Sequence, residues 1–221
     1  MNTIIDEDTL IELWYTDSQI MSILNRQLTG ERYNIITPTV FENNDLLSEN
    51  IRVAITAAVA GDISVMPLHL HGNHWSGIVI TSVLDQNENA VGVNIIFNNP
   101  QGQRLSDEPN FVQFQQLVMD ISLELFNNNH YVNIIDLHYG QQSNGNDCGV
   151  YTVDNLIRIA SAPGLRASGL EADVILEVSN LRSHLNASEI LELRNMHTDI
   201  LSELDNSALA GIISDSNEFH S

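Results

Sequence analysis

Hydrophobic residues recur with helical spacing in the first quarter of the chain. Residues 8–28 hold two such groups, which predict two short helices, and Asp17 between them can cap the second helix. Residues 49–60 are rich in Ala, Ile and Val, a composition typical of a helix packed on several sides. Short runs rich in β-branched residues follow, and they predict neighbouring strands at 63–70, 75–84 and 91–97.

The second half of the chain returns to the helical period, with one further strand inside it. Apolar residues on one face predict a helix over 110–126, and alternation predicts a strand over 131–137. A polar loop then leads to a helix over 148–160, which ends before Pro163 because proline cannot continue it. Two further amphipathic segments are predicted at 171–185 and 187–204.

This order of elements predicts an α+β fold, with a central mixed sheet flanked by helices and a helical extension after it. We divide the chain into a domain over residues 1–164 and an acidic helical extension over 165–221. The extension is expected to pack on the domain or to contact a partner.

Charge narrows the classes of partner. The chain has 29 acidic and 8 basic residues, which gives a formal net charge of -21. Such a surface would repel phosphate backbones and attract a basic protein, so nucleic acid is not expected as a ligand. No apolar run approaches the roughly 20 residues that a membrane-spanning helix needs, so no membrane contact is expected either.

Cys148 is the single cysteine of the chain, which excludes an internal disulfide and favours a reducing, cytoplasmic compartment. It follows a turn-forming loop and opens a predicted helix, where free N–H groups and the helix dipole lower the pKa of a thiol. This position makes Cys148 a candidate nucleophile. A small buried core residue is the alternative for a cysteine without further context.

Three histidines, His69, His71 and His74, lie at the end of the first predicted strand and in the short segment before the second. An imidazole with a pKa near neutrality suits a base that removes the proton of a thiol. The His-x-His spacing also suggests a metal site, but no carboxylate or cysteine stands at ligand spacing. We therefore expect no metal and no cofactor.

Two segments resemble a known family. Residues 141–151, QQSNGNDCGVY, resemble the nucleophile loop of the SUMO and ubiquitin-like-protein proteases, clan CE cysteine peptidases that include bacterial effector deubiquitinases. Residues 65–70 and 74–80 resemble the family's strand, short loop and His-Trp strand. The resemblance implies a papain-like or adenain-like cysteine protease fold, with residues 1–164 as the catalytic domain.

The resemblance implies roles for three residues. Cys148 would be the nucleophile and His74 the general base. In the family a Gln six residues before the Cys supports the oxyanion, and Gln142 stands at that position. Fixed donors such as the Gln142 amide and the Cys148 backbone N–H stabilise a developing oxyanion by roughly 3 kcal/mol each.

The third catalytic residue departs from the family pattern, which has an acid at the end of the next strand. Aligning VNIIFNNP, residues 93–100, puts Asn99 at the position of the acid and Asn98 one register away. A neutral amide can orient the imidazole, as in Cys-His-Asn proteases, but it stabilises imidazolium less than a carboxylate would.

The start of the chain extends the resemblance, because LWYTDSQI, residues 13–20, is similar to the family's Trp-Leu-x-Asp-x-x-Ile helix start. This implies that Trp14 and Trp75 flank the Gly-Gly tail of a substrate, since only glycine is thin enough to pass between two indoles. Asp17 and Gly149 would also contact the substrate. Either Trp can instead belong to the core.

These features predict a cysteine protease that cleaves peptide or isopeptide bonds after the Gly-Gly terminus of ubiquitin. Ubiquitin is preferred because its recognition surface and tail are basic and this chain is acidic. The alternatives are a SUMO- or NEDD8-specific protease, a clan CE acetyltransferase and a weakly active ubiquitin-binding module. The expected setting is the cytoplasm, including that of a host cell into which an intracellular bacterium secretes the protein.

Overall fold

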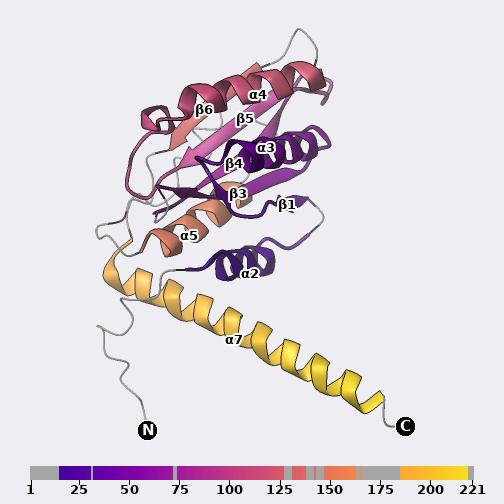
Figure 1. Cartoon of the computed structure of the whole chain (residues 1–221), viewed down its shortest axis with the longest axis vertical. Helices are drawn as coiled ribbons and strands as arrows, with labels where there is room; N and C mark the ends of the chain where they lie inside the picture. Colours follow the sequence, from indigo (N-terminus) through magenta and orange to yellow (C-terminus); the bar gives the residue numbers. More distant parts are fainter. Residues whose placement is uncertain are drawn as a thin grey trace.

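A mixed β-sheet lies between two layers of helices (Figure 1). The computed structural model describes residues 15–30, 32–71, 74–126, 131–137, 142, 147–162, 165 and 185–218, with side chains as far as residue 204. In chain order its elements are α2 (Asp17–Gln27), β1 (Tyr33–Ile35), β2 (Thr39–Val40), α3 (Asn44–Val59), β3 (Ile63–Leu70), β4 (His74–Leu84), β5 (Ala90–Asn98), the 3-10 turn η1 (Leu105–Asp107), α4 (Phe111–Phe126), β6 (Tyr131–Leu137), α5 (Cys148–Ser161) and α7 (Ala187–Glu218).

The sheet is antiparallel in its centre and parallel at both sides. Its strands follow the order β1-β3-β4-β5-β6, and β2 also pairs with β3. β4 runs antiparallel to β3 and β5, whereas β1, β2 and β6 are parallel to their neighbours. Leu70 pairs with His74, and Gly77 pairs with Asn98. The start of β4 and the end of β5 therefore meet at the same end of the sheet.

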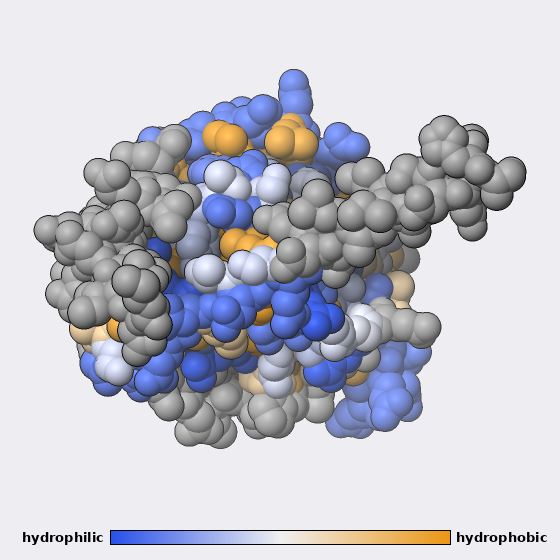
Figure 2. Space-filling model, turned by 90° about the horizontal axis from the view of Figure 1, so that it is seen from below, coloured by the Kyte–Doolittle hydropathy of each residue, from blue (hydrophilic) through white to orange (hydrophobic). Residues whose placement is uncertain are grey.

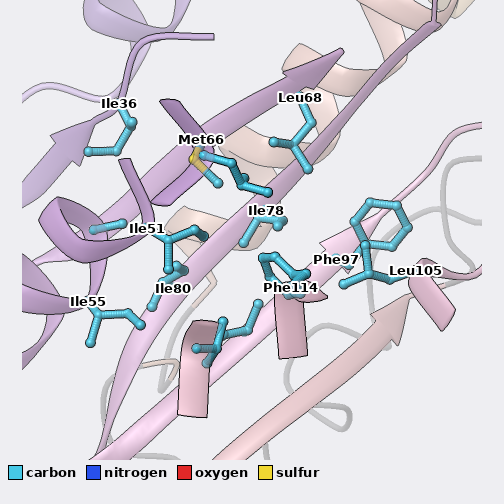
Figure 3. Close-up of a cluster of buried hydrophobic side chains, with 14 of the residues drawn as sticks. Ile36, Ile51, Ile55, Met66, Leu68, Ile78, Ile80, Phe97, Leu105 and Phe114 are labelled. Carbon is cyan, nitrogen blue, oxygen red and sulfur yellow. The ribbon is translucent and has the colours of Figure 1, made fainter. Parts of the chain in front are cut away.

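Each face of the sheet has its own core, because successive strand residues point to opposite faces. On one face, α3 and α4 cover Met66, Ile78 and Phe97 (Figure 3). On the other face, α2 and α5 cover Val65 and Val79. Burial on both faces explains why these strands are nearly continuous hydrophobic runs, with little of the polar alternation of a half-exposed sheet.

α7 adds an outer element on the side of α2 and α5 (Figure 1). Its residue Ile190 clusters with Tyr151 of α5, and Ile200 joins the core that α2 shares with the sheet. This helix therefore packs on both neighbouring helices. The boundary at residue 164 and the role of the extension stay predictions.

Thr16 caps α2, where Asp17 was expected to do so. The Thr16 side chain accepts a hydrogen bond from the Gln19 backbone N–H, and the Gln19 side chain accepts one from the Thr16 N–H at 2.9 Å. This reciprocal arrangement satisfies two N–H groups that the helix start would leave free. Asp17 is instead the first helical residue, where its negative charge still complements the helix dipole.

The predicted fold class is confirmed: the structure is α+β, with a mixed sheet flanked by helices. Strands 63–70 and 131–137 have the predicted bounds. β1 and β2 were not predicted, because strands of 3 and 2 residues carry too little of a period to be recognised.

The last predicted helix also differs from expectation, since α7 continues to Glu218 where the prediction stopped at residue 204. The first of the two helices predicted within 8–28 falls outside the described residues. So does the helix predicted at 171–185, apart from Leu185, which is not helical.

The contact between Gly77 of β4 and Leu156 of α5 yields a prediction about stability. A Cβ at Gly77 would lie 2.7 Å from Leu156 Cδ2 and 2.8 Å from Cδ1, which is too close. We expect Gly77→Ala to lower the free energy of unfolding by about 1–3 kcal/mol, measured by chemical denaturation, because overpacking strains this face of the sheet.

A double variant provides the control for this prediction. Leu156→Ala leaves a cavity and is expected to cost about 2–5 kcal/mol on its own. In Gly77→Ala/Leu156→Ala the new methyl group occupies part of that cavity. The double variant should therefore lose less unfolding free energy than the sum of the losses in the two single variants. Strict additivity would show that the two residues do not contact each other.

Candidate active site

The candidate catalytic residues meet where three elements begin or end. His74 begins β4, Asn99 follows β5 directly, and Cys148 is the first residue of α5. All three side chains are buried, with exposed fractions of 5%, 1% and 1% respectively. The antiparallel pairing of β4 with β5 places His74 and Asn99 together, and α5 packs against β4 from one face.

Asn99 determines which nitrogen of His74 carries a proton. The His74 Nε2 atom lies 2.7 Å from Asn99 Oδ1, and the backbone N–H of Gln101 donates to the same oxygen at 2.8 Å. An N–H group can only donate, so this Asn99 atom is the carbonyl oxygen and His74 Nε2 must be the donor. Neutral His74 therefore keeps its lone pair on Nδ1.

The Nδ1 atom of His74 is buried and has no hydrogen-bond partner among the residues that the structure describes. A lone pair held in this way is available to accept a proton from a neighbouring group. The arrangement of Asn99 and His74 is therefore that of a base whose orientation and tautomer are set in advance.

Backbone N–H groups surround the thiol of Cys148. Those of Trp75, Gly149 and Cys148 itself favour the thiolate and lower its pKa, but burial outweighs them and raises the pKa above its ordinary value. The pKa lowering expected at a helix start is thus present but is not the larger effect. Trp75 directly follows His74, so the thiol lies against the strand that carries the imidazole.

Burial also sets the charge of His74. It lowers the pKa of the imidazole below its ordinary value, and the nearby His71 lowers it further, while the hydrogen bond to Asn99 acts in the opposite direction. With the Cys148 pKa raised and the His74 pKa lowered, the neutral thiol and neutral imidazole are favoured over the ion pair near pH 7.

Gln142 lies beside the end of β5. Its backbone N–H donates to the carbonyl oxygen of Pro100 at 2.8 Å, one residue beyond Asn99. Its side-chain Oε1 is buried and has no partner among the described residues. The structure thus brings Gln142 next to the Asn99–His74 pair, and its part in stabilising an oxyanion stays a prediction.

Asn98 and Asn99 have different partners. Asn98 donates from Nδ2 to the Leu137 carbonyl oxygen at 3.1 Å, and its Oδ1 accepts from Asn155 Nδ2 at 2.7 Å. It therefore ties β5 to β6 and to α5, whereas Asn99 is the residue bonded to His74. A catalytic role for Asn99 stays a prediction, but the geometry favours it over Asn98.

The predicted substrate slot can be described on one side only, because Trp14 lies outside the described residues. Trp75 is 2% exposed and belongs to the core shared with α2 and α5. Its indole N–H donates to the Tyr15 carbonyl oxygen at 2.9 Å, and the His69 ring packs on it with a centroid distance of 3.6 Å. These contacts fix the indole, which suits either predicted role.

Asp17 and Gly149 border the same region. Asp17 Oδ1 lies 3.0 Å from His69 Nε2, and its side chain is 63% exposed, so it remains open to a partner. A Cβ at Gly149 would lie 3.0 Å from Tyr15 Cβ and 3.1 Å from Tyr15 Cγ. Tyr15 therefore packs directly on the start of α5 and leaves little room for a side chain at Gly149.

Sequence reasoning missed two contacts of α7 near this site. Arg194 is paired with Asp147, the residue before Cys148, and His197 Nδ1 lies 2.8 Å from the Tyr15 hydroxyl oxygen. Asp147 and Tyr15 both lie within the segments that resemble the protease family. Nothing in the sequence of the extension, however, indicated which of its residues would reach them.

No metal site and no membrane span emerge from the part of the chain that the structure describes. None of its groups of three or more His, Cys, Asp or Glu could hold a metal ion. None of its helices is both long and apolar enough to cross a bilayer.

Comparisons with known proteins find a matching family model and similar folds. Residues 62–169 match the family model described as RickCE-like, catalytic domain. The structure is similar to that of the Rickettsia bellii effector protein RickCE, with a TM-score of 0.57 and 19% identity over 86% of this chain and 94% of that chain. No curated protein matches the chain.

Two further solved structures share the fold. One is a de-sumoylating protease, with a TM-score of 0.55 and 14% identity over 92% of this chain and 85% of that chain. The other is the SUMO protease Ulp1, with a TM-score of 0.54 and 14% identity over 87% of this chain and 80% of that chain. The resemblance to clan CE proteases is confirmed.

The neutral side chain at Asn99 generates a prediction about pH dependence. A carboxylate there would stabilise imidazolium, raise the pKa of His74 and so favour the thiolate of Cys148 at neutral pH. We expect Asn99→Asp to speed alkylation of Cys148 by iodoacetamide at pH 7 by about tenfold and to move the onset of reaction to lower pH.

The matched control is Asn98→Asp. This change would replace the Nδ2 donor of residue 98 with a carboxylate oxygen that faces the carbonyl oxygen of Leu137. The variant should therefore be less stable, but Cys148 should not be alkylated faster. Equal or faster alkylation in the Asn98 variant than in the Asn99 variant would contradict the assignment of Asn99 as the partner of His74.

Proposed function

From the match of residues 62–169 to the RickCE-like catalytic domain, within a clan CE-like protease fold, we propose that the chain is a cysteine protease. It cleaves after the Gly-Gly terminus of ubiquitin or a ubiquitin-like protein. The observation that carries the proposal is the hydrogen bond from His74 Nε2 to Asn99 Oδ1, which leaves Nδ1 as a buried base at the start of the strand against which Cys148 lies.

The first half of the reaction forms a thioester. His74 Nδ1 takes the proton of the Cys148 thiol while the sulfur attacks the carbonyl carbon of the substrate's last glycine. The Gln142 side chain and the backbone N–H of Cys148 stabilise the negative charge on the carbonyl oxygen. The C–N bond then breaks, and the imidazolium of His74 gives its proton to the leaving amine.

The second half releases the modifier. Water attacks the thioester carbon, His74 Nδ1 takes a proton from that water, and the C–S bond breaks. The imidazolium of His74 returns its proton to the departing sulfur, and the new carboxylic acid loses its own proton to solvent, so the products are the carboxylate of the modifier and the free Cys148 thiol. Both pKa shifts favour the neutral pair, which supports transfer of the thiol proton to His74 as the sulfur attacks.

Charge supports ubiquitin as the modifier. The chain has a formal net charge of -21, and a basic recognition surface and tail would be drawn to it. The face on the α7 side is mostly hydrophilic, with hydrophobic residues in separate areas (Figure 2). Asp17, exposed and close to Trp75 through His69, is the acidic residue placed to meet a basic tail.

A SUMO-specific protease is the second candidate. The observation in its favour is the fold shared with a de-sumoylating protease and with Ulp1. The setting we propose follows from the likeness to RickCE, a bacterial effector: delivery into the cytoplasm of a host cell, where conjugates of the modifier are the substrates.

Modifiers that carry an electrophilic C-terminus test the proposal. We expect a covalent adduct on Cys148, detected by intact-protein mass spectrometry, with ubiquitin reacting faster than SUMO or NEDD8. Cys148→Ala removes the only thiol and should form no adduct.

The outcomes separate the candidate functions. Faster reaction with SUMO would identify SUMO as the preferred modifier and would still support a protease. If no modifier reacts while iodoacetamide still alkylates Cys148, the protease is refuted and the acetyltransferase and the ubiquitin-binding module remain.

Gln142 provides an independent prediction. We expect Gln142→Ala to lower kcat by about a hundredfold and to leave KM nearly unchanged, because an oxyanion donor acts in the transition state. Gln142→Glu keeps the size and replaces the donor, so it should be equally slow. Unchanged turnover in both variants would remove Gln142 from the mechanism.

A further inference from the structure

A buried ion pair joins α7 to the residue that precedes the nucleophile. Arg194 Nε donates to Asp147 Oδ1 at 3.1 Å, and Arg194 Nη2 contacts the same oxygen. The two side chains are 10% and 9% exposed. Asp147 is the N-cap residue of α5, yet its side chain makes no capping hydrogen bond. Its carboxylate therefore bonds a residue of α7. An N-cap carboxylate would ordinarily accept a hydrogen bond from an N–H group of its own helix.

The position of this pair matters because Asp147 is adjacent to Cys148 in the chain. A carboxylate so close opposes formation of the thiolate and contributes to the raised pKa of Cys148. The guanidinium of Arg194 offsets that charge and, through two contacts to one oxygen, restrains the residue before the thiol.

A second contact from the same helix reaches the other side of the thiol. His197, which is 1% exposed, has its Nδ1 atom 2.8 Å from the Tyr15 hydroxyl oxygen. Tyr15 packs on Gly149 and accepts the indole hydrogen bond of Trp75. One face of α7 therefore supports both residues that flank Cys148.

We propose that α7 is a working part of the active site and that Arg194 is a positioning residue for Cys148. It holds Asp147 at the start of α5 and balances the negative charge beside the thiol. The inference deepens the proposed function and rests on it only in taking Cys148 as the nucleophile.

Charged and titratable groups on several elements face the region around Cys148. A test that changes one of them must leave the others unsubstituted. They are Asp147 before α5, Tyr151 on α5, His74 on β4, His71 after β3, Tyr15 before α2, and Arg194 and His197 on α7. His197 has its pKa lowered to about 4, chiefly by burial, and so stays neutral throughout a titration above pH 6.

The test is the pH profile of Cys148 alkylation by iodoacetamide in the full chain, where the single cysteine makes the signal specific. We expect Arg194→Gln to slow alkylation at pH 7.5 at least about fivefold and to move the profile to higher pH. Arg194→Lys, which keeps the charge, should recover most of the rate. Asp147→Asn should move the profile to lower pH.

The matched control is Arg158→Gln. Arg158 also pairs with an aspartate on α5, with its Nε atom 2.6 Å from Asp154 Oδ2, and the pair lies beyond the first turn of the helix. Its removal should leave the alkylation profile unchanged. Thermal unfolding of every variant shows whether the fold is retained.

Two results would overturn the inference: a wild-type profile in Arg194→Gln, or an equal shift in Arg158→Gln. If Arg194→Gln does not fold, the Asp147→Asn variant provides the test. A wild-type alkylation profile in Asp147→Asn would refute the proposed effect of the Asp147 charge on Cys148. The readout needs no modifier, so failure of the ubiquitin and SUMO probes to react bears on the proposed function and leaves this inference standing.

Discussion

The packing of α5 directly on β4 is the constraint on which the site depends. Gly77 has no side chain, so Leu156 of α5 approaches the strand closely on that face. Because Cys148, the candidate nucleophile, begins α5 and His74, the candidate base, begins β4, this packing brings the thiol and the imidazole to the same region. Both groups sit on regular elements with cores on either face, and the sheet pairing supplies Asn99 from the adjacent strand.

The polar groups at the site are arranged within this apolar packing. Burial favours the neutral forms of Cys148 and His74, and the Asn99 amide is a neutral partner that orients the imidazole without adding charge. Cys148, His74 and Asn99 are thus all neutral in the absence of a ligand. Their arrangement provides the backbone N–H donors around the thiol and the lone pair on His74 Nδ1. Both pKa shifts thus favour a protonated thiol beside a neutral imidazole.

Much of this arrangement could be predicted from the sequence, and the parts that could not have physical reasons. Strand 63–70 was found because runs of β-branched residues are distinctive, and strand 131–137 because its residues alternate between apolar and polar. The choice between Asn98 and Asn99 stayed open because a one-residue slip exchanges the faces of a strand. The hydrogen bond between Asn99 and His74 now favours Asn99, whose catalytic role stays a prediction. The contacts of Arg194 and His197 depend on how α7 packs, which local patterns do not encode.

The bond between Tyr15 and His197 spans 182 positions of the chain. A ribosome therefore completes His74, Gln142 and Cys148 well before it makes Arg194 and His197. During that interval Asp147 lacks its partner Arg194, and Tyr15 lacks its contact with His197. The start of α5 therefore gains its full set of contacts only after His197 has been synthesised and α7 has docked on α2 and α5.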